Sequence, residues 1–404
     1  MNITRSILLP FCFLLLFIPG FRAQTWTSLT SGTSASLIGV CAISKDTVYV
    51  GGANGKIMKT TNGGVTWVTQ TTPTAQTLYG MDFINGNVGF AAGDNGAIIK
   101  TSNGGATWTS VSVTSSSLRS VRFISSTTGF ITGDGGLILK TTNGGTTWSV
   151  CSTGISDPIY AVWFIDPTNG YASSFSGDLL KTTNGGSTWT ASATGVSSQM
   201  NTIYFTDPST GTFVGAGGVI RRTTDGGVSW ATVTMTPSGD FLHSHTFVNS
   251  TTGFITGGNI GSNIGVILNT VDGGLTWSTY HPGTARLCNV DFVNANTGYA
   301  VGLNGTILKY TSPIGISEQS ATAKTLDVFP NPAKSSFTIS TTGLELEGTV
   351  YFELFDVAGN LVKKEELVNI SNLTIERGSL DAGIYFFTLS TNGKVAGTGK
   401  IIFE

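Results

Sequence analysis

The sequence predicts an all-β protein, a seven-bladed β-propeller followed by a small C-terminal antiparallel β-sandwich. The first observation is a nine-residue segment, KTTNGGVTW at 59–67, which recurs five more times at a spacing near 41 residues. The second is that each repeat holds four short apolar runs separated by turn residues, often Asn-Gly or Gly-Gly. The third is a change of composition after residue 312, where the repeats end.

Residues 1–23 are typical of a secretory signal peptide. Arg5 precedes the apolar run ILLPFCFLLLFIPG, and the small residue Ala23 precedes Gln24. A transmembrane anchor is the alternative, but the run is short for a span of about 20 residues and contains two prolines. No later segment is apolar enough to span a membrane, so we expect a cleaved, exported protein without a membrane span.

Composition excludes several classes of partner. Only 11% of residues are charged and the net charge is −2, so no basic surface for nucleic acid is expected. Without the signal peptide, three cysteines remain, an odd number without metal-ligand spacing. We interpret Cys41, Cys151 and Cys288 as small buried hydrophobes, and a Cys41–Cys288 disulfide between the first and last repeats is the alternative. No cofactor motif is present.

The repeats define a ring over residues 24–312. Six complete units are followed by a seventh, 287–311, that lacks the recurring segment, while TWTSL at 25–29 has the pattern of a fourth strand without its own unit. We predict that this N-terminal strand completes the seventh blade, which leaves no open sheet edge between blades.

We interpret the recurring segment as scaffold, because a catalytic group is seldom needed six times in one chain. Its Asn or Asp accepts hydrogen bonds from the turn backbone, its glycines provide positive φ, and its tryptophan packs between sheets. These Asn or Asp and Trp residues are Asn62 and Trp67, Asn103 and Trp108, Asn143 and Trp148, Asn184 and Trp189, Asp225 and Trp230, and Asp272 and Trp277.

The pattern Thr-x-Asn/Asp-Gly-Gly-x-Thr/Ser-Trp resembles the Asp-box, the bacterial neuraminidase repeat. In that family the box forms the hairpin between the third and fourth strands of a blade. With its Thr-Gly-Phe/Tyr and GxxGxIxKTTNGGxTW stretches, the whole unit is similar to propellers related to photosystem II stability and assembly factors. That resemblance covers about 290 residues and implies a protein-binding, non-enzymatic role.

Asp-boxes also occur in glycan-cleaving hydrolases, which are the alternative function. A glycosidase requires two carboxylates that flank the scissile bond. The propeller has no glutamate between Gln24 and Ile316 and no recognisable arginine triad. Asp82 and Asp291, at one equivalent position of two first strands, are the candidate pair. Hydrogen-bonded strand residues are the simpler interpretation, and we predict no catalytic residues and no enzyme.

Alignment of the first strands points to a binding surface. The second column varies while the packing columns stay apolar, and it contains two tyrosines, an arginine and a histidine, residue types that favour recognition. We therefore predict that Tyr79, Arg119, Tyr160 and His243 surround the channel mouth and bind a protein or glycan. His243 and His245 lack a neighbouring carboxylate or Cys motif, so no metal site is expected.

Residues 313–325 are polar and are interpreted as a linker, and 326–404 as the sandwich. Phe329-Pro330-Asn331-Pro332, then FDVAG at 355–359, then LDAGIYFF from Leu380 resemble the type A sorting domain of the type IX secretion system. The resemblance implies a Bacteroidetes-type bacterium, the secretion machinery as partner, and a secreted or surface-displayed product. A carbohydrate-binding sandwich is the alternative.

Overall fold

A computed structural model describes residues 25–234, 240–312, 324–341, 344, 346, 349–356, 361–367, 372–391 and 394–404. The boundary between two compact units falls after Ser312. The expected signal peptide and most of the expected linker lie outside the described residues. In the described part there is no α-helix, and no helix is long and apolar enough to cross a membrane.

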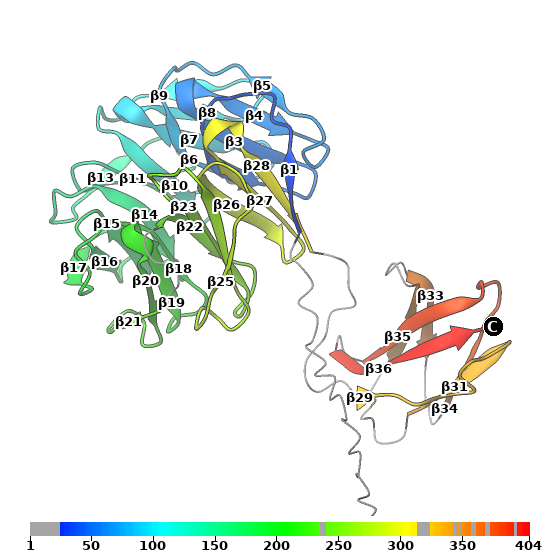
Figure 1. Ribbon diagram of the computed structural model, residues 1–404. Coiled ribbons are helices and arrows are strands. Elements are labelled where there is room, and N and C mark those ends of the chain that lie inside the picture. The colour runs from blue at the N-terminus through cyan, green and yellow to red at the C-terminus, as the bar shows by residue number, and fades with distance from the viewer. Residues whose placement is uncertain are drawn as a thin grey trace, which may run out of the picture. The chain divides into compact units, whose positions relative to one another are not determined.

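The first unit contains seven four-stranded antiparallel sheets in its described residues, which confirms the predicted seven-bladed propeller (Figure 1). The first strands line the channel: β2 (Leu37–Ala42), β6 (Leu78–Phe83), β10 (Leu118–Phe123), β14 (Ile159–Phe164), β18 (Met200–Phe205), β22 (Phe241–Phe247) and β26 (Leu287–Asn294). The second strands follow: β3 (Val48–Gly52), β7 (Gly89–Gly93), β11 (Gly129–Gly133), β15 (Gly170–Ser174), β19 (Gly211–Gly215), β23 (Gly253–Gly258) and β27 (Thr297–Gly302).

The third strands are β4 (Ile57–Thr60), β8 (Ile98–Thr101), β12 (Leu137–Thr141), β16 (Asp178–Thr182), β20 (Ile220–Thr223), β24 (Gly265–Thr270) and β28 (Ile307–Thr311). The outer strands are β5 (Val68–Gln70), β9 (Thr109–Val111), β13 (Ser149–Cys151), β17 (Thr190–Ala193), β21 (Ala231–Thr232), β25 (Ser278–Tyr280) and β1 (Thr25–Leu29). Short 3-10 turns follow four second strands, at η1 (Ala53–Gly55), η2 (Asp94–Gly96), η3 (Ala216–Gly218) and η4 (Leu303–Gly305).

The N-terminal strand closes the ring. β1 pairs antiparallel with β28 of the seventh blade, with Trp26 opposite Tyr310. Trp26 is 8% exposed and meets Phe254 of the sixth blade and Phe292 of the seventh edge-on, each at 6.0 Å between ring centroids. Trp148 meets Phe90 and Phe123 in the same way between the second and third blades. Trp26 therefore provides the packing of a recurring-segment tryptophan in the one blade that lacks that segment.

The recurring segment forms the hairpin between third and fourth strands, and its side chains fold back on the turn. In the first copy Thr60 Oγ1 accepts from Gly64 N at 2.9 Å, and Asn62 Oδ1 accepts from Thr66 N at 2.9 Å. Asp225 and Asp272 accept from the same turn positions. The glycine pairs have φ between +64° and +90°. The indole nitrogens of five of the six tryptophans are buried without a hydrogen-bond partner in the described part.

The segment also joins neighbouring blades. The lysine that opens it donates to the first glycine carbonyl of the next blade's segment, as with Lys140 Nζ and Gly185 O at 2.6 Å. The other such contacts are Lys59 to Gly104, Lys100 to Gly144, Lys181 to Gly226, Arg222 to Gly273 and Lys309 to Gly63. In the sixth blade the equivalent residue is Asn269, and the seventh blade, which follows it, has no such segment. Six copies thus correspond to six junctions.

Replacement of this lysine is expected to weaken one junction. Lys140→Met should lower the free energy of unfolding by about 1–2 kcal/mol, because the buried Gly185 carbonyl loses a charged donor. Urea unfolding followed by tryptophan fluorescence measures the change. Asn269→Lys is the control and should alter stability by no more than about 0.5 kcal/mol. A gain from Asn269→Lys as large as the Lys140 loss would contradict the junction assignment.

The second unit is a two-sheet β domain, as predicted. One sheet has the order β29 (Lys324–Thr325), β36 (Lys394–Phe403), β35 (Gly383–Thr391), β32 (Val350–Phe355), β33 (Leu361–Leu367). The other has the order β30 (Val328–Phe329), β31 (Ser336–Ser340), β34 (Asn372–Glu376). Phe337, Phe352, Phe387 and Phe403 fill its core. β29 pairs parallel with β36, so two residues of the expected linker lie in a strand and one pairing departs from the antiparallel pattern.

Candidate functional site at the channel mouth

The second-column residue of every first strand, which is the second residue of six strands and the third of β22, lies in a β-bulge. In β10, Leu118 pairs with Gly133 and Ser120 with Thr132, which leaves Arg119 without a partner. The same skip occurs at Ile38, Tyr79, Tyr160, Asn201, His243 and Cys288. A bulge turns its side chain away from the regular alternation of a strand. All seven side chains therefore line the mouth of one channel, a cavity of about 760 Å³.

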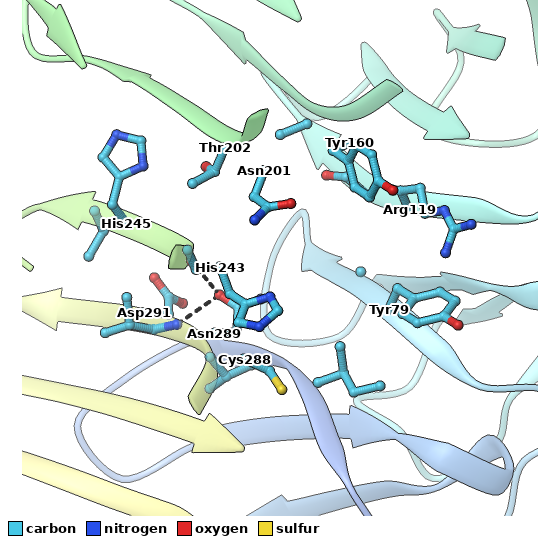
Figure 2. A pocket seen from close by; sticks show the side chains of 18 of the residues that line it. Tyr79, Arg119, Tyr160, Asn201, Thr202, His243, His245, Cys288, Asn289 and Asp291 are labelled. Carbon is cyan, nitrogen blue, oxygen red and sulfur yellow. Dashed lines mark hydrogen bonds between the residues drawn. The ribbon is translucent and has the colours of Figure 1, made fainter. Parts of the chain in front are cut away.

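Three of the four predicted residues form a continuous stack (Figure 2). The Arg119 guanidinium carbon lies 5.1 Å from the Tyr79 ring centroid and 5.8 Å from that of Tyr160. These side chains come from three consecutive blades. Tyr160 continues the stack onto Phe175, which is 49% exposed, at 6.4 Å between centroids. A cation is attracted to the face of an aromatic ring, so these side chains form one continuous wall of aromatic rings around the Arg119 charge.

Two aspartates fix this wall. Asp134 accepts two bonds from Arg119, to Nε and Nη2, both 2.8 Å long, and Asp94 accepts from the Tyr79 hydroxyl at 3.1 Å. Burial first and then Asp94 raise the pKa of Tyr79, so its hydroxyl stays protonated as a donor. Asp94 and Asp134 were not among the candidate residues of the sequence analysis. A repeat signal identifies them, because each follows its second-column residue by 15 positions, as Phe175 follows Tyr160.

His243 lies apart from the stack, across the mouth in Figure 2. Its ring packs against Phe241 at 4.7 Å between centroids. Burial, with a smaller contribution from Arg286, lowers the pKa of His243 to about 4, so the imidazole is neutral near pH 7. His245 instead bonds Thr212 Oγ1 at 2.9 Å inside the sheet packing. In the described part no three His, Cys, Asp or Glu side chains group as metal ligands.

Asp82 and Asp291 hold neighbouring blades together. Asp82 Oδ2 accepts from Phe123 N at 2.6 Å, and Asp291 Oδ2 accepts from Ala42 N at 2.8 Å, each in the next blade's first strand. Each also accepts from the backbone N–H that follows it. Their carboxylates are thus engaged by backbone donors.

The three cysteines of the described part are free, with Cys41 and Cys151 buried and Cys288 partly exposed.

Two family models match parts of the chain, one in each unit. Residues 66–195 match the family described as Photosynthesis system II assembly factor YCF48, and residues 327–404 match the Secretion system C-terminal sorting domain. The C-terminal unit is a sorting domain of the type IX secretion system. Such domains mark proteins exported to the cell surface or extracellular space in Bacteroidetes, so the propeller is cargo of that machinery. No curated protein matches the chain.

Solved structures share the propeller fold. YCF48 bound to D1 peptide has a TM-score of 0.62 and 18% identity, covering 73% of this chain and 99% of that one. YCF48 from Cyanidioschyzon merolae has 0.59 and 18%, covering 72% and 99%. The Niastella koreensis GH74 enzyme has 0.58 and 16%, covering 93% and 69%. These identities support the fold alone, and the similar structures include both a peptide-bound assembly factor and an enzyme.

Proposed function

We propose that this protein is an exported binding module that holds an extracellular protein or glycan at the channel mouth of the propeller. The observation that carries the proposal is the Tyr79–Arg119–Tyr160 stack, which three blades build and two aspartates fix around a 760 Å³ cavity. Tyrosine and arginine in a pre-organised site supply large contact area at little entropic cost. A wall that serves only packing has no need of these types.

The arrangement of carboxylates favours binding over hydrolysis. Retaining and inverting glycosidases both need one carboxyl group free to transfer a proton and another free to attack or to activate water. Asp82 and Asp291 each accept two backbone N–H bonds, one of them across a blade junction, and Asp134 is engaged by Arg119. The GH74 enzyme among the similar structures keeps glycan cleavage as the alternative to be tested.

The test uses the full chain with soluble polysaccharides, sialylated glycoproteins and a displayed peptide library, and it measures retention and released sugar together. The triple variant Tyr79→Ala, Arg119→Ala, Tyr160→Ala should weaken the retained ligand at least about tenfold, because the stack supplies the contact surface. Tyr280→Ala, an exposed tyrosine on β25, is the matched control and should bind normally.

Undiminished retention by the triple variant would place the site elsewhere. Sugar release that disappears in Asp82→Asn or Asp291→Asn would replace binding by hydrolysis. Retention without release, lost only in the triple variant, is the expected result.

A further inference from the structure

The channel mouth contains a second polar group opposite the tyrosine stack. Arg286 and His243 both line the cavity, and Arg286 Nε and His243 Nε2 are buried without a hydrogen-bond partner among the described residues. A buried polar atom without a hydrogen-bond partner lowers stability. Each of these two atoms therefore favours a ligand that supplies the missing partner. Tyr79 and Arg119, in contrast, have protein partners already.

The backbone of Arg286 and the first part of its side chain are held in place. Its backbone carbonyl accepts from Leu303 N at 2.9 Å, and its Cγ packs over Gly258, where an added Cβ would come within 3.0 Å. Gly258 begins the insertion at 258–265 that is peculiar to the sixth repeat. The backbone and Cγ of Arg286 are thus positioned by β23, the insertion and η4 together.

Arg119 and Arg286, which both line the cavity, differ in whether a carboxylate neutralises their charge. Arg119 is paired with Asp134 through two bonds, whereas no described carboxylate forms an ion pair with Arg286. His243 is neutral near pH 7 and offers one nitrogen that either donates or accepts. The Arg286 side of the mouth therefore carries one uncompensated positive charge, which attracts an anion of bidentate shape such as a carboxylate.

We propose that Arg286 and His243 form a carboxylate-binding subsite, and that the ligand of the proposed binding function is an acidic glycan. A uronic or sialic sugar combines the two features that the mouth offers. Its carboxylate pairs with Arg286 and His243, and the C–H faces of its neighbouring rings lie on Tyr79, Tyr160 and the exposed Phe175. This inference rests on the proposed function and adds the chemical class of the ligand.

The experiment titrates the full chain with galacturonate, alginate and hyaluronate oligosaccharides, and with carboxyl-reduced forms of the same three. Reduction removes the charge and keeps the sugar rings. At least one acidic oligosaccharide should bind about tenfold or more tightly than its reduced form. Arg286→Gln should remove that preference. His243→Ala should reduce the preference for the acidic form in part. Arg221→Gln makes the same charge change outside the cavity and should retain the preference.

The outcomes separate the inference from the function on which it rests. Equal affinity for acidic and reduced sugars overturns the carboxylate subsite, although glycan binding at the mouth stands. Binding of polyglutamate and of no oligosaccharide overturns the glycan class and leaves protein binding. Failure of every probe to bind overturns the inference. Circular dichroism of Arg286→Gln shows whether the fold is kept, and Arg286→Lys, which preserves the charge, should retain part of the preference.

Discussion

Replacement of Trp26 by alanine is expected to lower the free energy of unfolding of the propeller by about 3–5 kcal/mol. Trp26 is 8% exposed and packs edge-on against Phe254 of one blade and Phe292 of its own. Removal of the indole leaves a cavity at the junction where the chain's first strand closes the ring. A loss of this size is a large part of the stability of most domains.

Tryptophan fluorescence during urea unfolding measures this effect on the propeller alone, because all eight tryptophans lie between residues 26 and 277. Thr27→Ala is the control, since Thr27 is exposed on the same strand and should change stability by no more than about 0.5 kcal/mol. Equal effects of the two variants would show that β1 is not needed to close the ring.

The fold could be predicted from the sequence because the packing residues recur at a constant spacing. Trp67 to Trp277 mark the period, and Trp26, 41 residues before Trp67, marks the strand that the last blade lacks. The basic residue at each junction was also visible in the sequence, since Lys59 recurs as lysine in four other blades, is Arg222 in the fifth and is replaced only by Asn269. Their partners were not visible, because a bond from Lys140 to Gly185 joins residues 45 apart in different sheets.

The site was less accessible to sequence reasoning. Column variation pointed to Tyr79, Arg119 and Tyr160, and these three side chains do lie together, although their binding role stays a prediction. The bulge was missed, because strict alternation places His243 and His245 on one face, whereas the bulge at His243 separates them. Arg286 was missed as well. It precedes the aligned strand, and its lack of a partner is a property of the packed structure that no local pattern records.

Asp291 is expected to make propeller stability depend on pH. Burial raises the pKa of this carboxyl to about 6, against the opposing effects of the Ala42 N–H and Arg122, whereas the unfolded value is near 3.8. The folded state therefore binds more protons between these two values. The contribution of Asp291 is fully present below about pH 4, falls as pH rises through 6, and is then constant. A shift of about two units corresponds to roughly 3 kcal/mol.

The measurement compares wild type with Asp291→Asn by urea unfolding between pH 4 and pH 7.5. The wild type should lose about 2–3 kcal/mol relative to the variant over this range, because only the carboxyl becomes charged in the blade junction. Asp225, Asp272 and the other carboxyl groups titrate in both proteins and cancel in the difference. Asp46→Asn, an exposed control, should give a difference that does not vary with pH by more than about 0.5 kcal/mol.

A flat difference for Asp291→Asn would mean that the carboxylate is ionised at little cost, as a well-hydrated catalytic base is. The pH dependence thus bears on function as well as stability. A carboxyl group whose charge is opposed by burial and whose oxygens bond Ala42 and Phe292 of two blades is a structural link. A slope through pH 6 together with unaltered ligand retention by Asp291→Asn would assign Asp291 to the scaffold and leave recognition to the mouth above it.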